Sequence, residues 1–195
     1  MDRGRLARIV SASPERVGWR SRGYVPHLDA PDLVQHVVFR LADSLPAKFC
    51  GELEGLPKDR RAEAADAVLD NGYGARDLVL PEIAELVEGA LLRFDAERYS
   101  LLAWCVMPNH VHALIETRRD HRLESIVHSW KSFTAHAANR ALRREGSFWA
   151  PEYFDRYMRG DAHLAATRAY IEDNPVKARL CASAGDWPYS SARFA

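Results

Sequence analysis

Two short apolar runs separated by a Pro-Asn pair constrain the fold of this chain more than any other feature. The first run extends from Ser100 to Met107 and is nearly continuous, as a central β-strand would be. The second run, Val111 to Thr117, follows Met107-Pro108-Asn109, and Pro and Asn suit the two middle positions of a tight turn. The segment therefore predicts a β-hairpin.

Periodicity predicts helices and further strands on either side of this hairpin. Apolar residues recur at three- and four-residue steps from Leu80 to Phe94, with Pro81 in the first turn, where a missing N–H costs little. Asp161 can cap a later helix, which is expected to stop near Asn174 because Pro175 disfavours helical geometry in the residue before it. The other expected elements are a strand at 33–41, a helix at 123–142 and a strand within 148–159. This order predicts an α+β sandwich with an antiparallel sheet.

The length of 195 residues predicts one domain with appended segments. Residues 1–26 are rich in Arg, Ser and Gly without periodicity, which predicts a basic flexible arm before a single domain at 27–195. Residues 51–77 look like an insertion in that domain, because a charged, Ala-rich helix at 58–69 is closed by a turn cluster at 70–74.

Composition is that of an ordinary soluble protein, with 47% hydrophobic and 28% charged residues. No apolar run approaches the length of a membrane span, and the first residues lack the apolar core of a secretory signal, so we expect a cytoplasmic protein. Cys50, Cys105 and Cys181 are far apart, which suggests neither a disulfide framework nor a zinc knuckle.

The formal net charge is zero, but the charges are unevenly distributed along the chain. Residues 1–26 hold 6 basic and 2 acidic side chains, residues 27–97 hold 7 and 15, and residues 118–179 hold 12 and 8. A basic half suits a polyanion, since affinity for nucleic acid comes largely from Lys and Arg that neutralise phosphates. A solvated surface of scattered charge is the alternative interpretation.

His110 and His112 are the side chains that most suggest chemistry. Side chains alternate between the faces of a strand, so both imidazoles project from one face while Val111 points to the other. Such a pair can chelate one divalent ion and leave coordination positions open for substrate oxygens. Half-buried structural histidines are the alternative.

The last predicted helix could complete a site. Tyr170 and Asn174 are four residues apart and share a helix face. The amide oxygen could enter a metal shell, and the phenol could be presented to whatever the metal holds. Tyr170 could equally be a packing residue with its hydroxyl at the surface.

Four motifs occur in order along the chain. They are Met-Pro-Asn-His-Val-His at 107–112, Lys-Ser-Phe-Thr at 131–134, Tyr-Phe-Asp-Arg at 153–156 and Tyr-Ile-Glu-Asp-Asn-Pro-Val-Lys at 170–177. Together they resemble the single-tyrosine HUH transposases, and most closely their chromosomal branch, the REP-associated tyrosine transposases. The likeness covers roughly Leu33 to Trp187.

This resemblance implies a ferredoxin-like α+β sandwich whose C-terminal helix carries the nucleophile, Tyr170. It also implies that His110, His112 and Asn174 bind Mg²⁺ or Mn²⁺. The ion would stabilise charge on a scissile phosphate while Tyr170 attacks phosphorus, giving a 5′-phosphotyrosine and a free 3′-hydroxyl. A free phenol, with a pKa of about 10, is a poor nucleophile at neutral pH, and a nearby cation favours its phenolate.

The implied partner is single-stranded or hairpin DNA, such as a REP-like palindrome, bound by a nucleoid-associated monomer or homodimer. The basic side chains that could contact its phosphates are Arg118, Arg119, Arg122, Lys131, Arg156, Arg159, Lys177 and Arg179. The insertion at 51–77 overlaps none of the motifs, and we expect it to face away from the DNA, since its carboxylates would repel phosphates.

Two other functions are compatible with these residues. A metal-dependent hydrolase would use the two histidines with activated water, whereas a domesticated, sequence-specific DNA-binding protein would keep the fold without the reaction. The three differ in outcome, because a covalent protein–DNA adduct indicates transfer, cleavage without an adduct indicates hydrolysis, and retention without cleavage indicates binding alone.

Overall fold

A four-stranded antiparallel sheet organises the chain. The computed structural model describes residues 18–21, 26–29, 32–46, 49, 51–52 and 55–194. The strand order is β4-β5-β3-β6, and all neighbouring strands are antiparallel. The strands are β3 (Val34–Arg40), β4 (Tyr99–Val106), β5 (His110–Thr117) and β6 (Phe154–Tyr157). This confirms the predicted α+β fold, with the β-α-β-β-α-β order of a ferredoxin-like sandwich followed by a C-terminal helix.

The central hairpin joins β4 to β5 through Pro108 and Asn109, as predicted. The N–H of Met107 donates to the carbonyl of His110 at 2.9 Å, which closes a two-residue turn. Strand β5 begins at His110, one residue before the predicted start, so both histidines of the motif belong to the strand.

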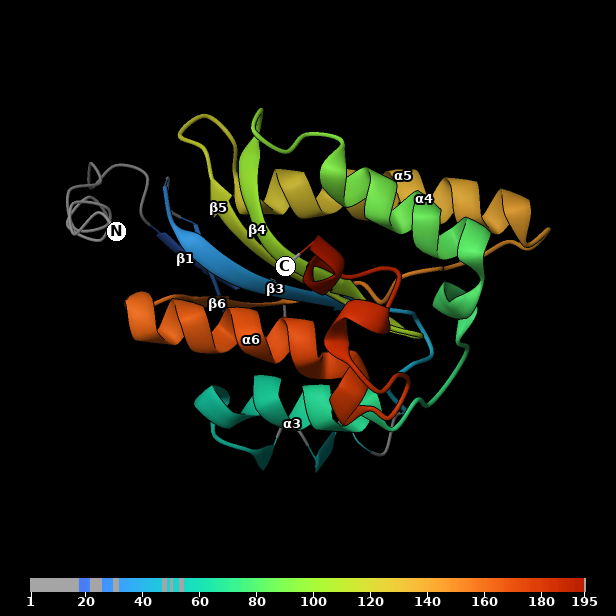
Figure 1. The fold of residues 1–195 in the computed structure, drawn as a ribbon. Coiled ribbons are helices and arrows are strands. Elements are labelled where there is room, and N and C mark those ends of the chain that lie inside the picture. The colour runs from blue at the N-terminus through green and yellow to red at the C-terminus, as the bar shows by residue number, and fades with distance from the viewer. Residues whose placement is uncertain are drawn as a thin grey trace.

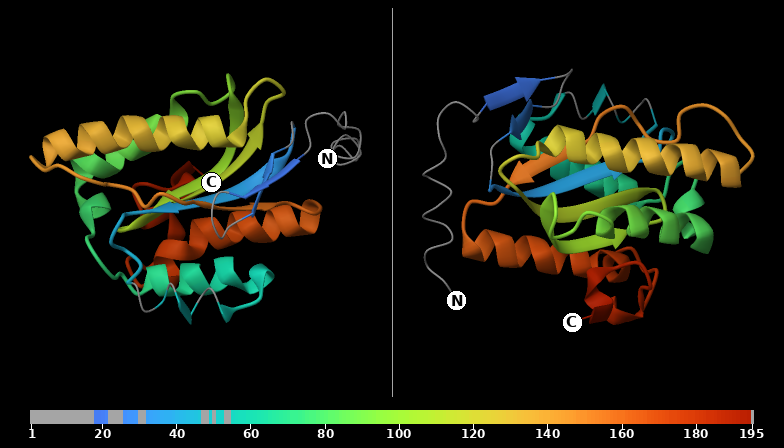
Figure 2. Two further views of the ribbon diagram at one scale, coloured as in Figure 1. Left: turned by 180° about the vertical axis from the view of Figure 1, so that it is seen from behind. Right: turned by 90° about the horizontal axis from the view of Figure 1, so that it is seen from above.

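The two faces of the sheet are covered differently. Helices α4 (Pro81–Leu92) and α5 (Leu123–Ala141) cover one face, and α6 (Asp161–Lys177) packs on the other (Figures 1 and 2). Phe39, Val111 and Trp130 are buried in the main core, between the sheet and the helices α4 and α5. Burying one such side chain stabilises the fold by about 1.5–3 kcal/mol, so this layer anchors the sheet.

Helices α4 and α5 agree with their predicted ranges. Pro81 occupies the first turn of α4, and α5 ends at Ala141, one residue before the predicted end. None of the helices in the described part of the chain is both long and apolar enough to cross a membrane.

Helix α6 does not stop before Pro175, so the predicted end near Asn174 is wrong. The helix continues to Lys177 with Pro175 inside it, and Gly160 rather than Asp161 takes the N-cap position without a side-chain cap bond. Ile171, Asn174 and Pro175 are all buried in the last turns. Packing of this face outweighs the local preference of the residue before proline, which is a bias and not a prohibition.

The segment predicted as a flexible arm contains regular structure at one end. Strand β1 (Gly18–Ser21) pairs antiparallel with β2 (Pro26–Asp29), so residues 18–21 are not irregular. Pairing of this kind depends on hydrogen bonds between backbone N–H and C=O groups, which the pattern of side chains does not predict. Residues 1–17 of the predicted arm lie outside the described residues.

The predicted insertion contains helix α3 (Lys58–Asp70), which lies below α6 in the view of Figure 1. Ala65 and Leu69 of α3 are buried in one cluster with Val38 of β3. The loop after the helix requires Gly74, because its φ is +76° and a Cβ there would lie 2.4 Å from the carbonyl oxygen of Asp43. The helix is therefore docked against the α6 side of the sheet.

Candidate active site

His110 and His112 lie side by side on the face of the sheet that α6 covers, and both are fully buried. Their Nε2 atoms are 2.9 Å apart. Burial, reinforced by the neighbouring imidazoles, lowers the pKa of His110 to about 3 and the pKa of His112 well below its usual value. Both rings are therefore neutral at neutral pH, which is the state in which an imidazole binds a metal.

Asn109 determines which nitrogen of His110 carries the proton. Its Nδ2 donates to the carbonyls of Leu69 and Tyr73, each at 3.1 Å, so Oδ1 is the atom that faces His110. This oxygen lies 2.7 Å from Nδ1 of His110 and can only accept, so the proton of the neutral ring is on Nδ1. The Nε2 lone pair of His110 is left to face His112.

A third histidine, His36 of β3, supports the pair. Its Nε2 lies 3.0 Å from Nδ1 of His112, and when His112 donates this bond its own Nε2 is also a free lone pair. Burial, with Arg156 and His163 nearby, lowers the pKa of His36 to about 4. Sequence reasoning missed His36, because strand alternation indicates a face but not which strand is the neighbour.

Helix α6 brings Tyr170 and Asn174 to the histidines, as their shared helix face predicted. Nδ2 of the buried Asn174 lies 3.2 Å from Nε2 of His112. The half-buried ring of Tyr170 stands edge-on to His112, with 5.8 Å between ring centroids, and lies 6.3 Å from the ring of His36. Nζ of Lys177 lies 4.5 Å from the centroid of the Tyr170 ring, a cation–π contact that places a positive charge beside the phenol.

The insertion also reaches this site, although it overlaps none of the motifs in the sequence. Leu69 in the last turn of α3 and Tyr73 in the turn after it accept the two hydrogen bonds from Asn109, and Oδ1 of Asp70 lies 3.7 Å from Nε2 of His110. Burial raises the pKa of Asp70 to about 6, while Lys177 acts in the opposite direction. These two hydrogen bonds of Asn109 join the hairpin turn to the turn after α3.

These groups offer the donors that a divalent cation requires. Oδ1 of Asn174 and Oδ1 of Asp70 are buried without a hydrogen-bond partner, close to the two imidazoles. Among the described residues, His, Cys, Asp and Glu side chains alone form no group of three around one position. A third ligand must therefore be an amide, or Asp70 must move closer to the two imidazoles. A half-turn of the Asn174 amide exchanges Nδ2 for Oδ1 and directs the oxygen toward His112.

The sequence model of the family described as "Transposase IS200 like" matches residues 76–174, about half of the chain. This chain belongs to the IS200-like transposase family. The matched range contains His110, His112, Tyr170 and Asn174, and it begins after α3. The resemblance inferred from the motifs is thereby confirmed, and α3 lies outside the part shared with the family model.

A relative and a solved structure add to this assignment. A Haemophilus influenzae protein named as a REP-associated tyrosine transposase is 30% identical over 103 residues, which are 48% of this chain and 58% of that protein. The match therefore spans little more than half of the relative's length. The structure of a REP-associated tyrosine transposase bound to a REP hairpin is 17% identical, covers 90% of this chain and 82% of its own, and gives a TM-score of 0.59, so it shares the fold.

The basic residues predicted to contact phosphate lie at different places relative to the histidines of this transposase family member. Arg156 pairs with His36 across β6 and β3, so it lies on the face of the site, and Lys177 lies beside Tyr170. By contrast, Arg118 and Arg119 follow the far end of β5, about 20 Å along the strand from His112. Arg122 is the N-cap of α5, on the opposite face. Arg159 and Arg179 are exposed just before and just after α6.

Lys131 is not placed like a phosphate ligand. Its Nζ donates to the carbonyls of Ala150 and Pro151, each at 2.7 Å, and it belongs to α5 on the face away from the histidines. Burial lowers the pKa of Lys131 to about 8. The side chain joins α5 to the segment before β6, which is a structural role that its charge alone did not indicate.

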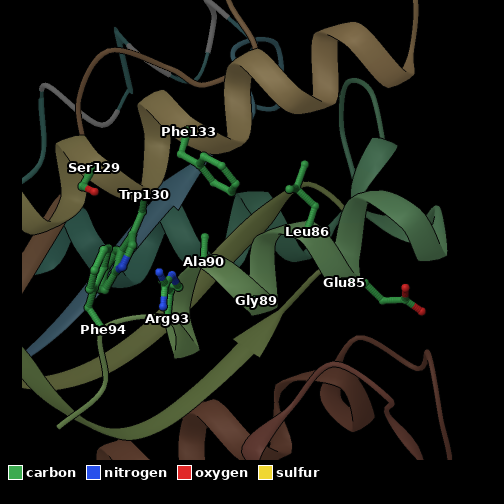
Figure 3. Close-up of a pocket in the computed structure, with 9 residues that line it drawn as sticks. All are labelled: Glu85, Leu86, Gly89, Ala90, Arg93, Phe94, Ser129, Trp130 and Phe133. Carbon is green, nitrogen blue, oxygen red and sulfur yellow. The ribbon is translucent and has the colours of Figure 1, made fainter. Parts of the chain in front are cut away.

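A pocket between α4 and α5 lies on the other side of the sheet from the histidines. Trp130 and Phe133 of α5 face Ala90 of α4 and Phe94 across it, as Figure 3 shows. The lining is mainly apolar, with Arg93 and Glu85 at its polar positions. The pocket is therefore separate from the group formed by Tyr170, His110 and His112.

Proposed function

We propose that this chain is a DNA strand transferase that cuts and rejoins single-stranded or hairpin DNA through Tyr170. One observation carries the proposal: the ring of Tyr170 stands 5.8 Å from the ring of His112, which lies beside the second imidazole of the pair. A nucleophile and a cation-binding pair on neighbouring elements are the two parts that phosphodiester transfer requires.

In the proposed reaction, the Oη atom of Tyr170 forms a bond to the scissile phosphorus as the bond to the 3′-oxygen breaks. The phenol loses its proton, and the leaving 3′-oxygen gains one to become a hydroxyl. The product is a 5′-phosphotyrosine, in which the number of phosphodiester-type bonds is unchanged. Attack by a 3′-hydroxyl therefore rejoins DNA without an external energy source, whereas hydrolysis would lose that bond.

We propose that His110, His112 and Asn174 hold Mg²⁺ or Mn²⁺. The buried, unpartnered Oδ1 of Asn174 and the converging imidazole nitrogens support this choice. When bound, the cation supplies positive charge against the charge that builds on the phosphate oxygens. Asn109 keeps His110 in the tautomer that presents Nε2, and His36 does the same for His112 when its Nε2 accepts the bond from Nδ1 of His112.

The proposed DNA is a hairpin with single-stranded flanks, because the fold is shared with a protein whose structure contains a REP hairpin. Arg156 and Lys177 are the basic side chains placed closest to the site, and they would contact phosphates near the cut. Arg159 and Arg179, at the two ends of α6, would extend this path along the helix.

Adduct trapping tests the proposal. The full chain is incubated with hairpin oligonucleotides from the flanks of its own gene, in Mn²⁺, Mg²⁺ or EDTA, and resolved under denaturing conditions. A label at the 3′ end follows the adduct, and a label at the 5′ end follows the fragment with the free hydroxyl. We expect both products with the wild type and with the control Tyr157→Phe, and neither with Tyr170→Phe.

The alternative functions give different outcomes in the same assay. Cleavage without an adduct would indicate a metal-dependent hydrolase, and retention without cleavage would indicate a DNA-binding protein. An adduct that persists in Tyr170→Phe would move the nucleophile to another tyrosine, with Tyr153 and Tyr157 of the aromatic motif as the first candidates.

A further inference from the structure

We infer that Asp70, carried by helix α3 of the insertion, is a further ligand of the divalent cation in the proposed site. The inference rests on the proposed function, since it concerns the same cation as His110, His112 and Asn174. It assigns the insertion a part in the reaction centre, although α3 lies outside the range that the family model matches.

The position of the Asp70 carboxylate carries the inference. Oδ1 lies 3.7 Å from Nε2 of His110 and is buried, yet it has no hydrogen-bond partner. Two ligand atoms on one Mg²⁺ ion, each at about 2.1 Å, are at most about 4.2 Å apart, so the separation of 3.7 Å is compatible with a shared cation. A buried carboxylate oxygen without a partner is costly, and a bound cation would remove that cost.

The backbone that carries this carboxylate is held by contacts before and after Asp70. Leu69 packs with Val38 and Phe154 on the sheet. Asn109 donates to the carbonyls of Leu69 and Tyr73, on either side of Asp70. The amide that fixes the His110 tautomer thus also fixes the backbone that carries Asp70, so the two ligands are positioned by one residue.

The charge of the site points to the same conclusion. Two imidazoles and one amide are neutral, so without Asp70 the protein ligands would leave the full double charge of the cation uncompensated. A carboxylate reduces it by one and adds the hard oxygen donor that Mg²⁺ and Mn²⁺ prefer over nitrogen. Oδ1 of Asp70 lies 3.7 Å from Nε2 of His110, beyond hydrogen-bonding distance, and a bound cation would supply an attraction between these two ligands.

Binding of Mn²⁺ alone, without DNA, tests the inference. Titration of the full chain is followed by calorimetry and by the electron paramagnetic resonance signal of free Mn²⁺. We expect Asp70→Asn to weaken Mn²⁺ binding by about tenfold or more, and Asp70→Glu to retain more of it because a carboxylate remains. Asp173→Asn is the matched control, since it removes the same charge from an exposed residue next to Asn174.

The outcomes separate this inference from the proposed function. If Asp70→Asn binds Mn²⁺ like the wild type while His110→Ala and His112→Ala do not, Asp70 is not a ligand and the proposed metal site stands. If the wild type shows no Mn²⁺ binding at all, both are overturned. Circular dichroism and metal-free unfolding of each variant show whether a loss reflects the site or the fold, and Asp70→Glu decides the matter if Asp70→Asn does not fold.

Discussion

Oδ1 of Asn109 lies 2.7 Å from Nδ1 of His110, and this contact links the turn of the central hairpin to the chemistry of the strand that follows. The same amide donates to the carbonyls of Leu69, in the last turn of α3, and Tyr73, in the turn that follows. One side chain therefore couples the tautomer of a proposed ligand to the docking of the insertion.

We expect Asn109→Ala to weaken Mn²⁺ binding by roughly 10- to 100-fold, as is typical when a partner of a ligating histidine is lost. The variant should also unfold more easily by about 1–3 kcal/mol, because the buried Nδ1 of His110 and the carbonyls of Leu69 and Tyr73 each lose a hydrogen bond. Calorimetry and urea unfolding measure the two effects. Asn71→Ala is the control, since its amide only caps α3 at Ala67 on the exposed side. Unchanged Mn²⁺ affinity in Asn109→Ala would show that metal binding does not depend on the His110 tautomer that Asn109 fixes.

The different positions of Arg156 and Lys131 predict different effects on the salt dependence of DNA binding. For a single strand, each phosphate contact contributes about −0.7 to the slope of log affinity against log salt concentration. Arg156→Gln should flatten that slope by about one such step, because Arg156 lies on the face of the site. Lys131→Gln should leave the slope unchanged and lower stability, because its ammonium donates to two carbonyls of its own chain. Fluorescence anisotropy with a labelled hairpin at several salt concentrations measures both slopes, and equal flattening in the two variants would reject this division.

Stability of the metal-free chain should fall in acid because of the histidines. The pKa of His36 is about 4 in the folded chain and 6.5 as an ordinary histidine. The unfolded chain therefore binds more protons between these values, so the free energy of unfolding decreases as the pH is lowered through the window. For one group this amounts to roughly 2–3 kcal/mol. Urea unfolding in EDTA across this range should show a weaker pH dependence for His36→Gln than for the exposed control His128→Gln. Identical curves would mean that His36 does not titrate on unfolding.

Local patterns predicted most of the fold. The hairpin, α4 and α5 followed from runs, turn residues and periodicity that lie within each element. The end of α6 did not, because the burial of Ile171 and Pro175 against the sheet is a tertiary effect that outweighs the bias at the residue before proline. Residues 18–21 were missed for a related reason, since their pairing with β2 depends on backbone hydrogen bonds.

The candidate site was predictable only where its residues share an element. His110 and His112 share a strand, and Tyr170 and Asn174 share a helix, so spacing alone brought each pair together. His36 is 76 residues away from His112 in the chain, and only the register between β3 and β5 makes them neighbours. Asp70 reached the site through the docking of α3, which no local signal in the insertion indicated. The phosphate-contact roles of the basic residues stay predictions, and the two bonds of Lys131 to backbone carbonyls argue against that role for Lys131.

The two-residue turn at Pro108 and Asn109 has a consequence for how this protein can change. Along β5, imidazoles and core side chains alternate, so His110 and His112 face α6 while Val111 and Ala113 face α5. One residue added to the turn or removed from it would shift the strand by a single step and exchange the two sets. The imidazoles would then enter the layer of Trp130, and the valine would occupy the place of a ligand. A substitution near the turn therefore changes one side chain, whereas a change in the length of the turn would disrupt the candidate site and the core at the same time.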